Sequence, residues 1–366
     1  MRINGQKFHT IWFDINHPET VKIIDQQKLP FEFCIKSLHS FHDAFVAIKD
    51  MTVRGAPLIG VTAAFGMYLG LYGCTSELPA DEYTNVLARE MKTARPTAVN
   101  LSYAVDLVMN ALQGCDSFAE MAGKALETAM QLKQSEIDSS SAIGDFGLTL
   151  IEQVAVQKPG KPVNILTHCN AGWLACIDWG TALAPVYKAH EKGIPVHVWV
   201  DETRPRNQGS KLTAFELLNE GIAHTVITDN TGGHLMQHGL VDLVLVGSDR
   251  TTRRGDVCNK IGTYLKALAA RDNGIPFYVA LPTSSIDFSI SDGLTEITIE
   301  ERNGDEVRSI EGKDGKAQVV PDNSPVYNIG FDVTPAKLVT ALITEKGIFA
   351  ASEESIFRLL GSQTSV

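Results

Sequence analysis

Residues 163–282 alternate between short apolar runs and segments with helical spacing, and this rhythm constrains the fold more than any other feature of the chain. The apolar runs predict strands, and the segments between them predict helices. We expect strands at 163–169, 195–202, 224–230, 241–249 and 276–282, and helices at 171–192, 210–220, 231–238 and 257–273. Such alternation is typical of βαβ units, so the sequence predicts a Rossmann-like, doubly wound parallel sheet.

The chain on either side of this region has other patterns. Before it, a short β-rich start is followed by helical spacing, with helices expected at 41–50, 57–73, 80–93, 98–113, 117–134 and 140–156. After it, 295–310 predicts a hairpin across an Asn-Gly turn, and 334–347 predicts a final helix. The polar stretch QKPGKP at 157–162 separates the two main patterns and is the expected boundary between them. At 366 residues the chain is long for one core, so we expect a small, mainly helical N-terminal domain at 1–156 and an α/β C-terminal domain at 163–366.

The composition excludes several classes of partner. A net charge of −11 argues against nucleic-acid binding, which needs basic side chains to displace phosphate counterions. The most apolar long segment, 57–73, is short for a membrane span and contains four glycines, so we expect a buried helix and no membrane contact. The six cysteines are scattered without a CxxC pair, and no secretory signal is recognisable, so we expect reduced thiols and a cytoplasmic location.

Polar side chains that can do chemistry follow the expected strands. They are His168-Cys169-Asn170, Asp201-Glu202, Asp229-Asn230 and Ser248-Asp249, at four of the five parallel strands. In open α/β sheets, ligands bind outside the carboxyl ends of the strands. We therefore predict a site along this edge of the sheet.

Two residues at this edge are candidates for the chemistry itself. Cys169 stands at a strand end next to an expected helix N-terminus, a position that favours a reactive thiol, although a free cysteine in a buried turn is often only a small apolar side chain. Asp249 follows the run VLVGS and can be a general acid or base, a ribose ligand or a cap for the next helix.

Other residues are candidates for holding an anion or a sugar. The chain has neither a GxGxxG nor a GxxxxGK[ST] motif, so a dinucleotide or P-loop site is not expected. An arginine and free amides ahead of a helix can bind phosphate, and a lysine at a loop–helix junction can do the same, although each can be a plain helix entry or a solvated side chain. The candidates are Arg54 with the Gly55-Ala56 amides, Arg95, the Asn259-Lys260 pair and, for sugar hydroxyls, Gln208.

A metal site is not expected. His234 and His238 have the i, i+4 spacing of zinc ligands on a helix, but no third ligand accompanies them at a typical spacing. A solvent-facing helix explains this pair better. We expect no metal and no cofactor.

Seven stretches, in order, resemble the S-methyl-5-thioribose-1-phosphate isomerase family. They are RGAPLIG, RPTAVNL, THCNAGWLACIDWGTAL, ETRPRNQGSKLTAFEL, VGSDRTTRRGDVCNKIGTY, IPFYVALPTSSID and FDVTPAKLVTALITEKG. The family belongs to a larger group with ribose-1,5-bisphosphate isomerases and the regulatory subunits of translation initiation factor 2B. The resemblance implies two domains, a homodimer, and conversion of an aldose 1-phosphate to a ketose 1-phosphate without metal or nucleotide.

Carried over position by position, the resemblance also implies a role for each residue that matches a family motif. It makes Asp249 the proton donor and Cys169 the second catalytic group, with the substrate held by Arg54, Gly55, Ala56, Arg95, Gln208, Asn259 and Lys260. A sugar phosphorylated at C1 must open its ring before hydrogen can move from C2 to C1. Asp249 can protonate the ring oxygen only if it carries a proton near neutral pH, which burial favours. Cys169 then acts as a thiolate base, or stabilises a cationic centre while hydride shifts directly.

The sequence departs from the family pattern at several positions near the expected site. They are Trp173, Asn207, Ser248, Arg254 and Cys258. None removes a catalytic candidate, so they leave open what the sugar carries at C5: methylthio, hydrogen or phosphate. A second phosphate would need a further cation, for which Arg206 and Arg254 are candidates. A regulatory module without enzymatic activity is the alternative from another class.

Overall fold

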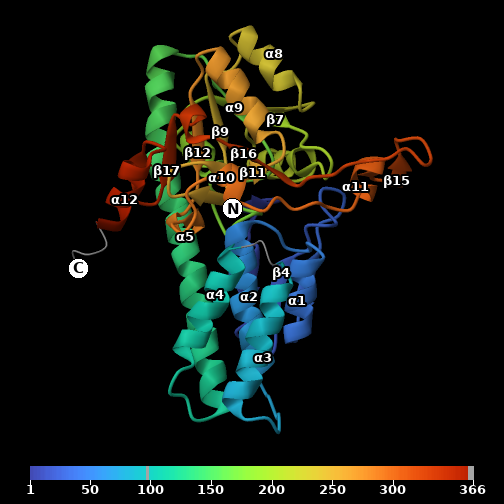
Figure 1. Ribbon diagram of the computed structural model, residues 1–366. Helices are drawn as coiled ribbons and strands as arrows, with labels where there is room; N and C mark the ends of the chain where they lie inside the picture. The colour runs from blue at the N-terminus through green and yellow to red at the C-terminus, as the bar shows by residue number, and fades with distance from the viewer. Residues whose placement is uncertain (96–98, 362–366) are drawn as a thin grey trace. The chain divides into compact units, whose positions relative to one another are not determined.

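The computed structural model describes residues 1–95 and 99–361, and its residues form two compact units (Figure 1). The helical unit consists of Met1, Lys7–Ser139 and Trp173–Gly180. The sheet unit consists of Arg2–Gln6, Ser140–Gly172 and the chain from Thr181 onward. The division into domains 1–156 and 163–366 stays a prediction, because a domain is defined by independent folding.

The helical unit packs helices against a small antiparallel sheet. The sheet has the order β3-β4-β5, and α2 contacts α1, α3 and α4. Because α2 is apolar on every side, it is buried along nearly its whole length, as expected for 57–73. No helix in the described parts of the chain is long and apolar enough to span a membrane. The elements are β3 Ile11–Phe13, β4 Val21–Ile24, β5 Ile35–Leu38, α1 Phe41–Lys49, α2 Ala56–Leu71, α3 Ala80–Thr93, α4 Val99–Ala111 and the first part of α5 Phe118–Gln157.

The sheet unit is built on a doubly wound sheet with the order β18-β17-β12-β9-β6-β7-β8. All neighbouring strands from β17 to β8 pair in parallel, and the edge strand β18 is antiparallel. The α/β fold class expected from the sequence is therefore confirmed. The strands are β6 Val163–Thr167, β7 Val196–Asp201, β8 His224–Ile227, β9 Leu243–Val246, β12 Phe277–Ala280, β17 Ala341–Thr344 and β18 Gly347–Phe349.

Strand order reverses between β6 and β9. The chain runs outward from β6 through β7 to β8, and then returns to β9 on the other side of β6 before continuing to β12 and β17. This is the topological switch point of an open α/β sheet, beside which ligands bind. Leu166 and Val244 pair across it, and both belong to the apolar core under α8, α9 and α12. The helices of this unit are α6 Ala184–Glu191, α7 Ala214–Asn219, α8 Thr231–Gln237, α9 Thr263–Asp272 and α12 Glu353–Gly361.

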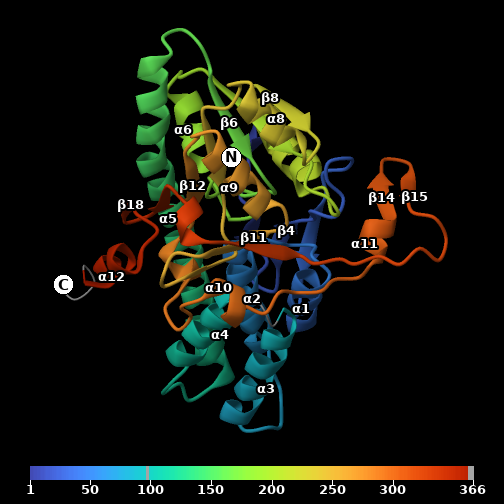
Figure 2. The same ribbon diagram turned by 45° about the horizontal axis from the view of Figure 1, so that its top comes forward.

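A second sheet and several short elements complete the sheet unit. The second sheet has the order β13-β10-β11-β16, and β14 and β15 form a separate hairpin (Figure 2). The remaining strands are β1 Arg2–Ile3, β2 Gln6–Lys7, β10 Arg250–Thr252, β11 Val257–Lys260, β13 Ile286–Asp287, β14 Ser309–Gly312, β15 Gly315–Gln318 and β16 Phe331–Thr334. The short helices are a π-helix at Gly209–Thr213, 3₁₀ turns at Thr283–Ser285 and Ala336–Leu338, and α10 Gly293–Glu296 and α11 Asp305–Arg308.

Two expected helices are wrong over part of their length, and a third is wrong throughout. The helix at 171–192 exists only as α6, because Trp179 and Gly180 have positive φ and Pro185 starts the helix anew. The helix at 257–273 begins only at Thr263, since residues 257–260 form β11 and Gly262 lies at φ 104°. The helix at 334–347 is instead the end of β16, a 3₁₀ turn, β17 and the start of β18.

Two further expectations are corrected. The helices at 117–134 and 140–156 are one 40-residue helix, α5, because the serines at 139–141 do not interrupt it. The hairpin at 295–310 is absent from these residues, which form α10, α11 and the start of β14. The hairpin lies further on, where β14 and β15 pair around Lys313 and Asp314. Residue 98, the expected start of α4, lies outside the described residues.

Leu166 offers a test of the core at the switch point. Its side chain is fully buried, whereas Leu218 on α7 is 71% exposed. We expect Leu166→Ala to lower the free energy of unfolding by about 2–5 kcal/mol, because it leaves a cavity beside β9. Leu218→Ala, the matched control, should change it by less than about 0.5 kcal/mol. Urea denaturation followed by circular dichroism measures both, and equal effects would contradict the assigned packing.

Candidate active site

The two strands that flank the switch point carry the candidate catalytic residues at their carboxyl ends. His168, Cys169 and Asn170 follow β6, and Asp249 follows β9 after Gly247 and Ser248. Because β6 and β9 pair in parallel, their carboxyl ends lie at the same edge of the sheet. The topology therefore brings the Cys169 and Asp249 segments to one edge.

The backbone of Cys169 is held on both sides by threonine hydroxyls. Its N–H donates to Thr203 Oγ1 at 2.8 Å, and its carbonyl accepts from Thr213 Oγ1 at 2.7 Å. Both Cys169 and Thr203 have φ 65°, a left-handed conformation that is uncommon for such residues. The expected helix N-terminus beside the thiol is wrong, because residues 171–183 form turns. The position of Cys169 is set by these hydrogen bonds instead.

Asn170 is fixed by a buried carboxylate. Its amide donates to Glu216 Oε1 at 2.8 Å and to Thr213 Oγ1 at 3.2 Å, and Glu216 also accepts from the Tyr187 hydroxyl. Gly172 passes so close to this carboxylate that an added Cβ would lie 1.7 Å from Glu216 Oε2. A side chain at position 172 would therefore displace the Glu216 carboxylate that holds Asn170.

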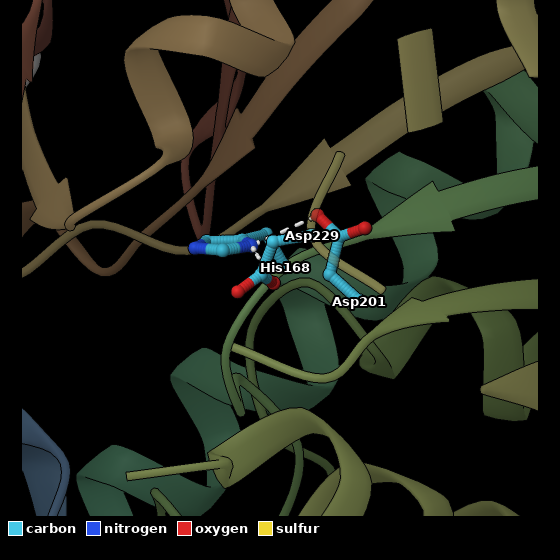
Figure 3. A group of neighbouring side chains, drawn as sticks. All are labelled: His168, Asp201 and Asp229. Carbon is cyan, nitrogen blue, oxygen red and sulfur yellow. Dashed lines mark hydrogen bonds and ion pairs between the residues drawn. The ribbon is translucent and has the colours of Figure 1, made fainter. Parts of the chain in front are cut away.

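His168 belongs to a cluster of ionisable side chains at the edge of the sheet (Figure 3). Its Nδ1 lies 2.9 Å from Asp201 Oδ2 and 3.9 Å from Asp229 Oδ1, and Lys266 Nζ lies 3.0 Å from the same Asp201 oxygen. Asp229 itself accepts from the Thr203 N–H at 2.8 Å. Three of the strand-end residues named from the sequence, His168, Asp201 and Asp229, thus meet at the edge of the sheet.

Asp249 lies beside β11. Its backbone N–H donates to the Cys258 carbonyl at 3.0 Å, and its side chain is half-buried. Burial raises the pKa of the Cys258 thiol to about 12, and Asp249 acts in the same direction when its carboxyl is ionised. Cys258 is therefore a neutral thiol at physiological pH and does not compete with Cys169 as a thiolate.

Asn259 and Lys260 are buried on β11, not on a helix as expected. Asn259 Nδ2 donates to Thr263 Oγ1 at 3.0 Å, and Lys260 Nζ lies 4.6 Å from the centre of the Phe331 ring. The chain just beyond them is tied to β6, because His168 Nε2 lies 2.8 Å from the Ile261 carbonyl oxygen. Asn259 and Lys260 therefore reach the same edge as Cys169.

Gln208 lies in the segment that follows β7. It is 4% exposed, and its Oε1 is buried without a hydrogen-bond partner in the described part of the chain. An unpaired buried carbonyl is costly, so this oxygen fits a donor such as a hydroxyl of a bound ligand. The segment is held from outside by Arg204, whose guanidinium donates to the Val307 carbonyl at 2.9 Å, and by the Arg206–Glu306 ion pair.

The other four expected ligands lie in the helical unit. Arg54 is half-buried, and Gly55 caps α2 at φ 94° with the Ala175 carbonyl oxygen 2.1 Å from where a Cβ would be. Ala56 begins α2, and Arg95 lies just beyond α3. That Arg54, Gly55, Ala56 and Arg95 join the residues around Cys169 stays a prediction.

Lys266 was missed by the sequence analysis, although the sequence held a signal. Thr263, Lys266, Ala267 and Ala270 have the i, i+3, i+4, i+7 spacing of one helix face, and all are buried. A lysine on the apolar face of an amphipathic helix needs a buried anionic partner. Asp201 is that partner. Thr203 and Thr213, in contrast, carried no signal, because their roles depend on backbone conformation.

Comparison with known proteins identifies the family. The model of the initiation factor 2 subunit family matches residues 52–351. The chain belongs to this family. Among relatives named methylthioribose-1-phosphate isomerase, one from Desulfatibacillum aliphaticivorans is 52% identical over 97% of this chain and 98% of its own, and one from Methylorubrum populi is 54% identical over 97% of each.

Solved structures of the family have the same fold. The 5-methylthioribose 1-phosphate isomerase from Pyrococcus horikoshii superposes with a TM-score of 0.84 at 35% identity, covering 98% of this chain and 97% of its own. The translation initiation factor eIF-2B subunit delta from A. fulgidus superposes with a TM-score of 0.80 at 36% identity, covering 96% of this chain and 100% of its own. The resemblance stated from the sequence motifs is confirmed.

Glu306 gives a pH-dependent test of how the segment after β7 is held. Burial alone would raise its pKa, but hydrogen bonds and charge from Arg302, with hydrogen bonds from Arg206 and Asn328, lower it from 4.5 to about 2. A lowered carboxyl pKa stabilises the folded state above pH 4.5, and this contribution disappears as the pH falls toward about 2. Glu306→Gln should therefore cost on the order of 2 kcal/mol at pH 7, and less as the pH falls below 4.5.

The measurement is the free energy of unfolding of both proteins between pH 7 and pH 3. Glu354→Gln is the matched control, because its ion pair with Arg358 is exposed and should contribute less than about 1 kcal/mol at any pH. A Glu306→Gln effect independent of pH would contradict the assigned ion pairing.

Proposed function

We propose that the chain is an aldose–ketose isomerase that converts S-methyl-5-thio-ribose 1-phosphate to S-methyl-5-thio-ribulose 1-phosphate, a step of methionine salvage. The observation that carries the proposal is full-length similarity of 52–54% to relatives named for this activity. Cys169 and Asp249, at the ends of adjacent strands beside the switch point, support it. The chemistry below is part of the proposal.

Ring opening is assigned to Asp249. The sugar is closed by its ring oxygen, and the C1 phosphate removes the free aldehyde, so enolisation cannot begin until the ring oxygen is protonated and its bond to C1 breaks. Asp249 in its acid form donates that proton. Its half-buried position and its place above the apolar strand β9 favour the neutral acid.

Hydrogen transfer is assigned to Cys169. After ring opening, a hydrogen must leave C2 and one must arrive at C1. Cys169 as a thiolate removes the C2 proton and gives an enol phosphate. The Cys169 thiol then returns this proton to C1 while the Asp249 carboxylate takes the proton of the C2 hydroxyl, which gives the ketone. In the other route, hydride shifts directly from C2 to C1, and the sulfur stabilises the positive charge. Both routes place Cys169 beside C2.

The remaining residues hold the substrate. Lys260 and Asn259, together with Arg54, Arg95 and the amides of Gly55 and Ala56, supply positive charge and N–H donors for the phosphate. Gln208 accepts a hydrogen bond from a sugar hydroxyl through its buried Oε1, which has no other partner in the described part of the chain. A second phosphate at C5 is disfavoured, because Arg206 is paired with Glu306, and Arg254 Nε lies 3.7 Å from Glu353. We therefore propose an uncharged substituent at C5.

We further propose a homodimer in the cytoplasm that needs neither metal nor nucleotide. No resident cofactor enters the acid–base steps above, since each proton transfer is assigned to a side chain of this chain. Sedimentation equilibrium of the purified protein tests the homodimer, and a single-chain mass would contradict it.

A substrate panel tests the reaction and the C5 substituent together. Methylthioribose 1-phosphate, 5-deoxyribose 1-phosphate and ribose 1,5-bisphosphate are compared at equal concentration with EDTA present, and ketose phosphate is followed by NMR. We expect the methylthio sugar to have the highest kcat/KM. A higher kcat/KM for 5-deoxyribose 1-phosphate or for ribose 1,5-bisphosphate would identify the protein as an isomerase of that sugar instead. If no sugar is turned over, the remaining hypothesis is a regulatory protein without enzymatic activity, which the similarity to eIF-2B subunit delta suggests.

Substitution of the two catalytic candidates separates chemistry from binding. Asp249→Asn and Cys169→Ser should each lower kcat by about 10²–10⁴-fold with little change in KM, since positioned acids and bases contribute this much. Asp314→Asn, on the exposed turn between β14 and β15, and Cys34→Ser, a half-buried thiol of the helical unit, are the controls and should retain activity. Full activity of Cys169→Ser would remove that residue from the mechanism.

A further inference from the structure

The two ring nitrogens of His168 face a carboxyl oxygen that also pairs with Lys266 and a backbone carbonyl oxygen, and both of these accept hydrogen bonds. Nδ1 lies 2.9 Å from Asp201 Oδ2, and Nε2 lies 2.8 Å from the Ile261 carbonyl oxygen. A neutral imidazole has one N–H and one bare lone pair, so it can satisfy only one of these contacts. The doubly protonated imidazolium satisfies both. The geometry therefore favours a cationic ring.

The surroundings of the ring balance this charge. His168 is 1% exposed and Asp201 is fully buried, so the charges cannot rely on bulk water. Lys266, on α9, also binds Asp201 Oδ2, and Asp229, after β8, is the second carboxylate near the ring. Two cations thus meet two carboxylates. Asp332 on β16 also faces the ring, but burial raises its pKa despite hydrogen bonds from the Gly262 and Tyr264 N–H groups.

A metal ion fits this cluster less well than a proton does. His168, Asp201 and Asp229 bring ligand atoms within 4.8 Å of one another. However, the direct 2.9 Å contact between Nδ1 and Asp201 Oδ2 leaves no place for an ion between them. Both oxygens of Asp229 are also occupied, each accepting a backbone N–H at 2.8 Å from Thr203 or Arg204. Lys266 already supplies the additional positive charge.

We propose that His168 is a permanent imidazolium that positions Cys169 and stabilises its thiolate. The ring ties the residue before Cys169 to β7 through Asp201 and to the loop after Lys260 through Ile261. His168 directly precedes Cys169 in the chain, and a cation close to a cysteine favours its thiolate form. The role in catalysis rests on the proposed function, and it selects the route in which Cys169 is the base that removes the C2 proton.

The charge of the ring is measured directly on the unmodified full-length protein. With ¹⁵N-labelled histidine, NMR reports the two ring nitrogens of His168 between pH 6 and pH 9. We expect both to keep their protons across this range. The resonances are assigned by their loss in His168→Gln or, if that variant does not fold, by their displacement in Lys266→Gln. One bare ring nitrogen at pH 7 would overturn the proposal.

The effect on Cys169 is measured in His168→Gln, which keeps a polar side chain but removes the charge. The thiolate absorbs at 240 nm, and the difference between each protein and the same protein with Cys169→Ser isolates this sulfur. We expect the midpoint of its titration to rise by about one pH unit, because loss of the cation leaves Asp201 and Asp229 balanced by Lys266 alone. His190→Gln, which removes an exposed imidazole on α6, is the control and should not move it.

Kinetics distinguish positioning from a purely structural role. The pH at which kcat is half-maximal on the acidic limb should move upward by the same amount in His168→Gln, with KM nearly unchanged. A uniform loss of kcat at every pH would contradict the charge role. If no sugar of the panel is turned over but the ring is doubly protonated and the thiolate midpoint moves, the proposed function fails while the charge assignment stands. Turnover with a neutral ring overturns the charge assignment alone.

Discussion

Asp201 is a carboxylate with no exposed surface, and the cost of burying its charge organises much of the sheet unit. It lies at the end of β7, and it is neutralised by His168 from the end of β6 and by Lys266 from α9. Each of these groups is on a different element. The elements therefore have to meet at one place for the charge to be satisfied, and that place is the edge of the sheet beside Cys169.

The candidate catalytic residues depend on this arrangement without being part of it. The Thr203 hydroxyl that accepts the Cys169 N–H follows Asp201 by two residues, and the loop after Lys260 is held by the His168 ring. Asp249 is placed by a different interaction, the parallel pairing of β9 with β6, and by its backbone hydrogen bond to β11. Buried polar contacts thus position one side of the site, and sheet topology positions the other.

The sequence predicted the parallel strands well, because runs such as 163–169 and 241–249 are apolar, β-branched and bounded by turn residues. The prediction from the sequence was wrong at β17, because the run ALIT within 334–347 also fits helical spacing. Short apolar runs cannot be assigned to a helix or a strand by periodicity alone. The helix predicted over 171–183 was wrong for another reason, because nothing in the local composition indicates that Trp179 has positive φ. Tertiary contacts decide such conformations.

The site was predictable in its residue types but not in its contacts. Cys169, Asp249, Asn259 and Lys260 stood out because they follow strands or resemble family motifs. The assumed helix beside Cys169 was wrong, and the groups that hold Cys169 in place, Thr203 and Thr213, act through hydroxyls on its backbone. Such contacts link residues more than 30 positions apart, and neither composition nor spacing contains them.

The conformation of Thr203 has a consequence for attempts to make this protein more robust. A β-branched residue at φ 65° is an outlier, and glycine or asparagine would adopt that backbone with less strain. Replacing Thr203 would relieve this strain but leave the buried Cys169 N–H without its acceptor, and both effects are about 1–3 kcal/mol. The replacement would also delete the hydroxyl that fixes the Cys169 backbone. The strained backbone of Thr203 is therefore coupled to the position of Cys169, and a variant that relieves the strain is expected to lose the alignment of its thiol.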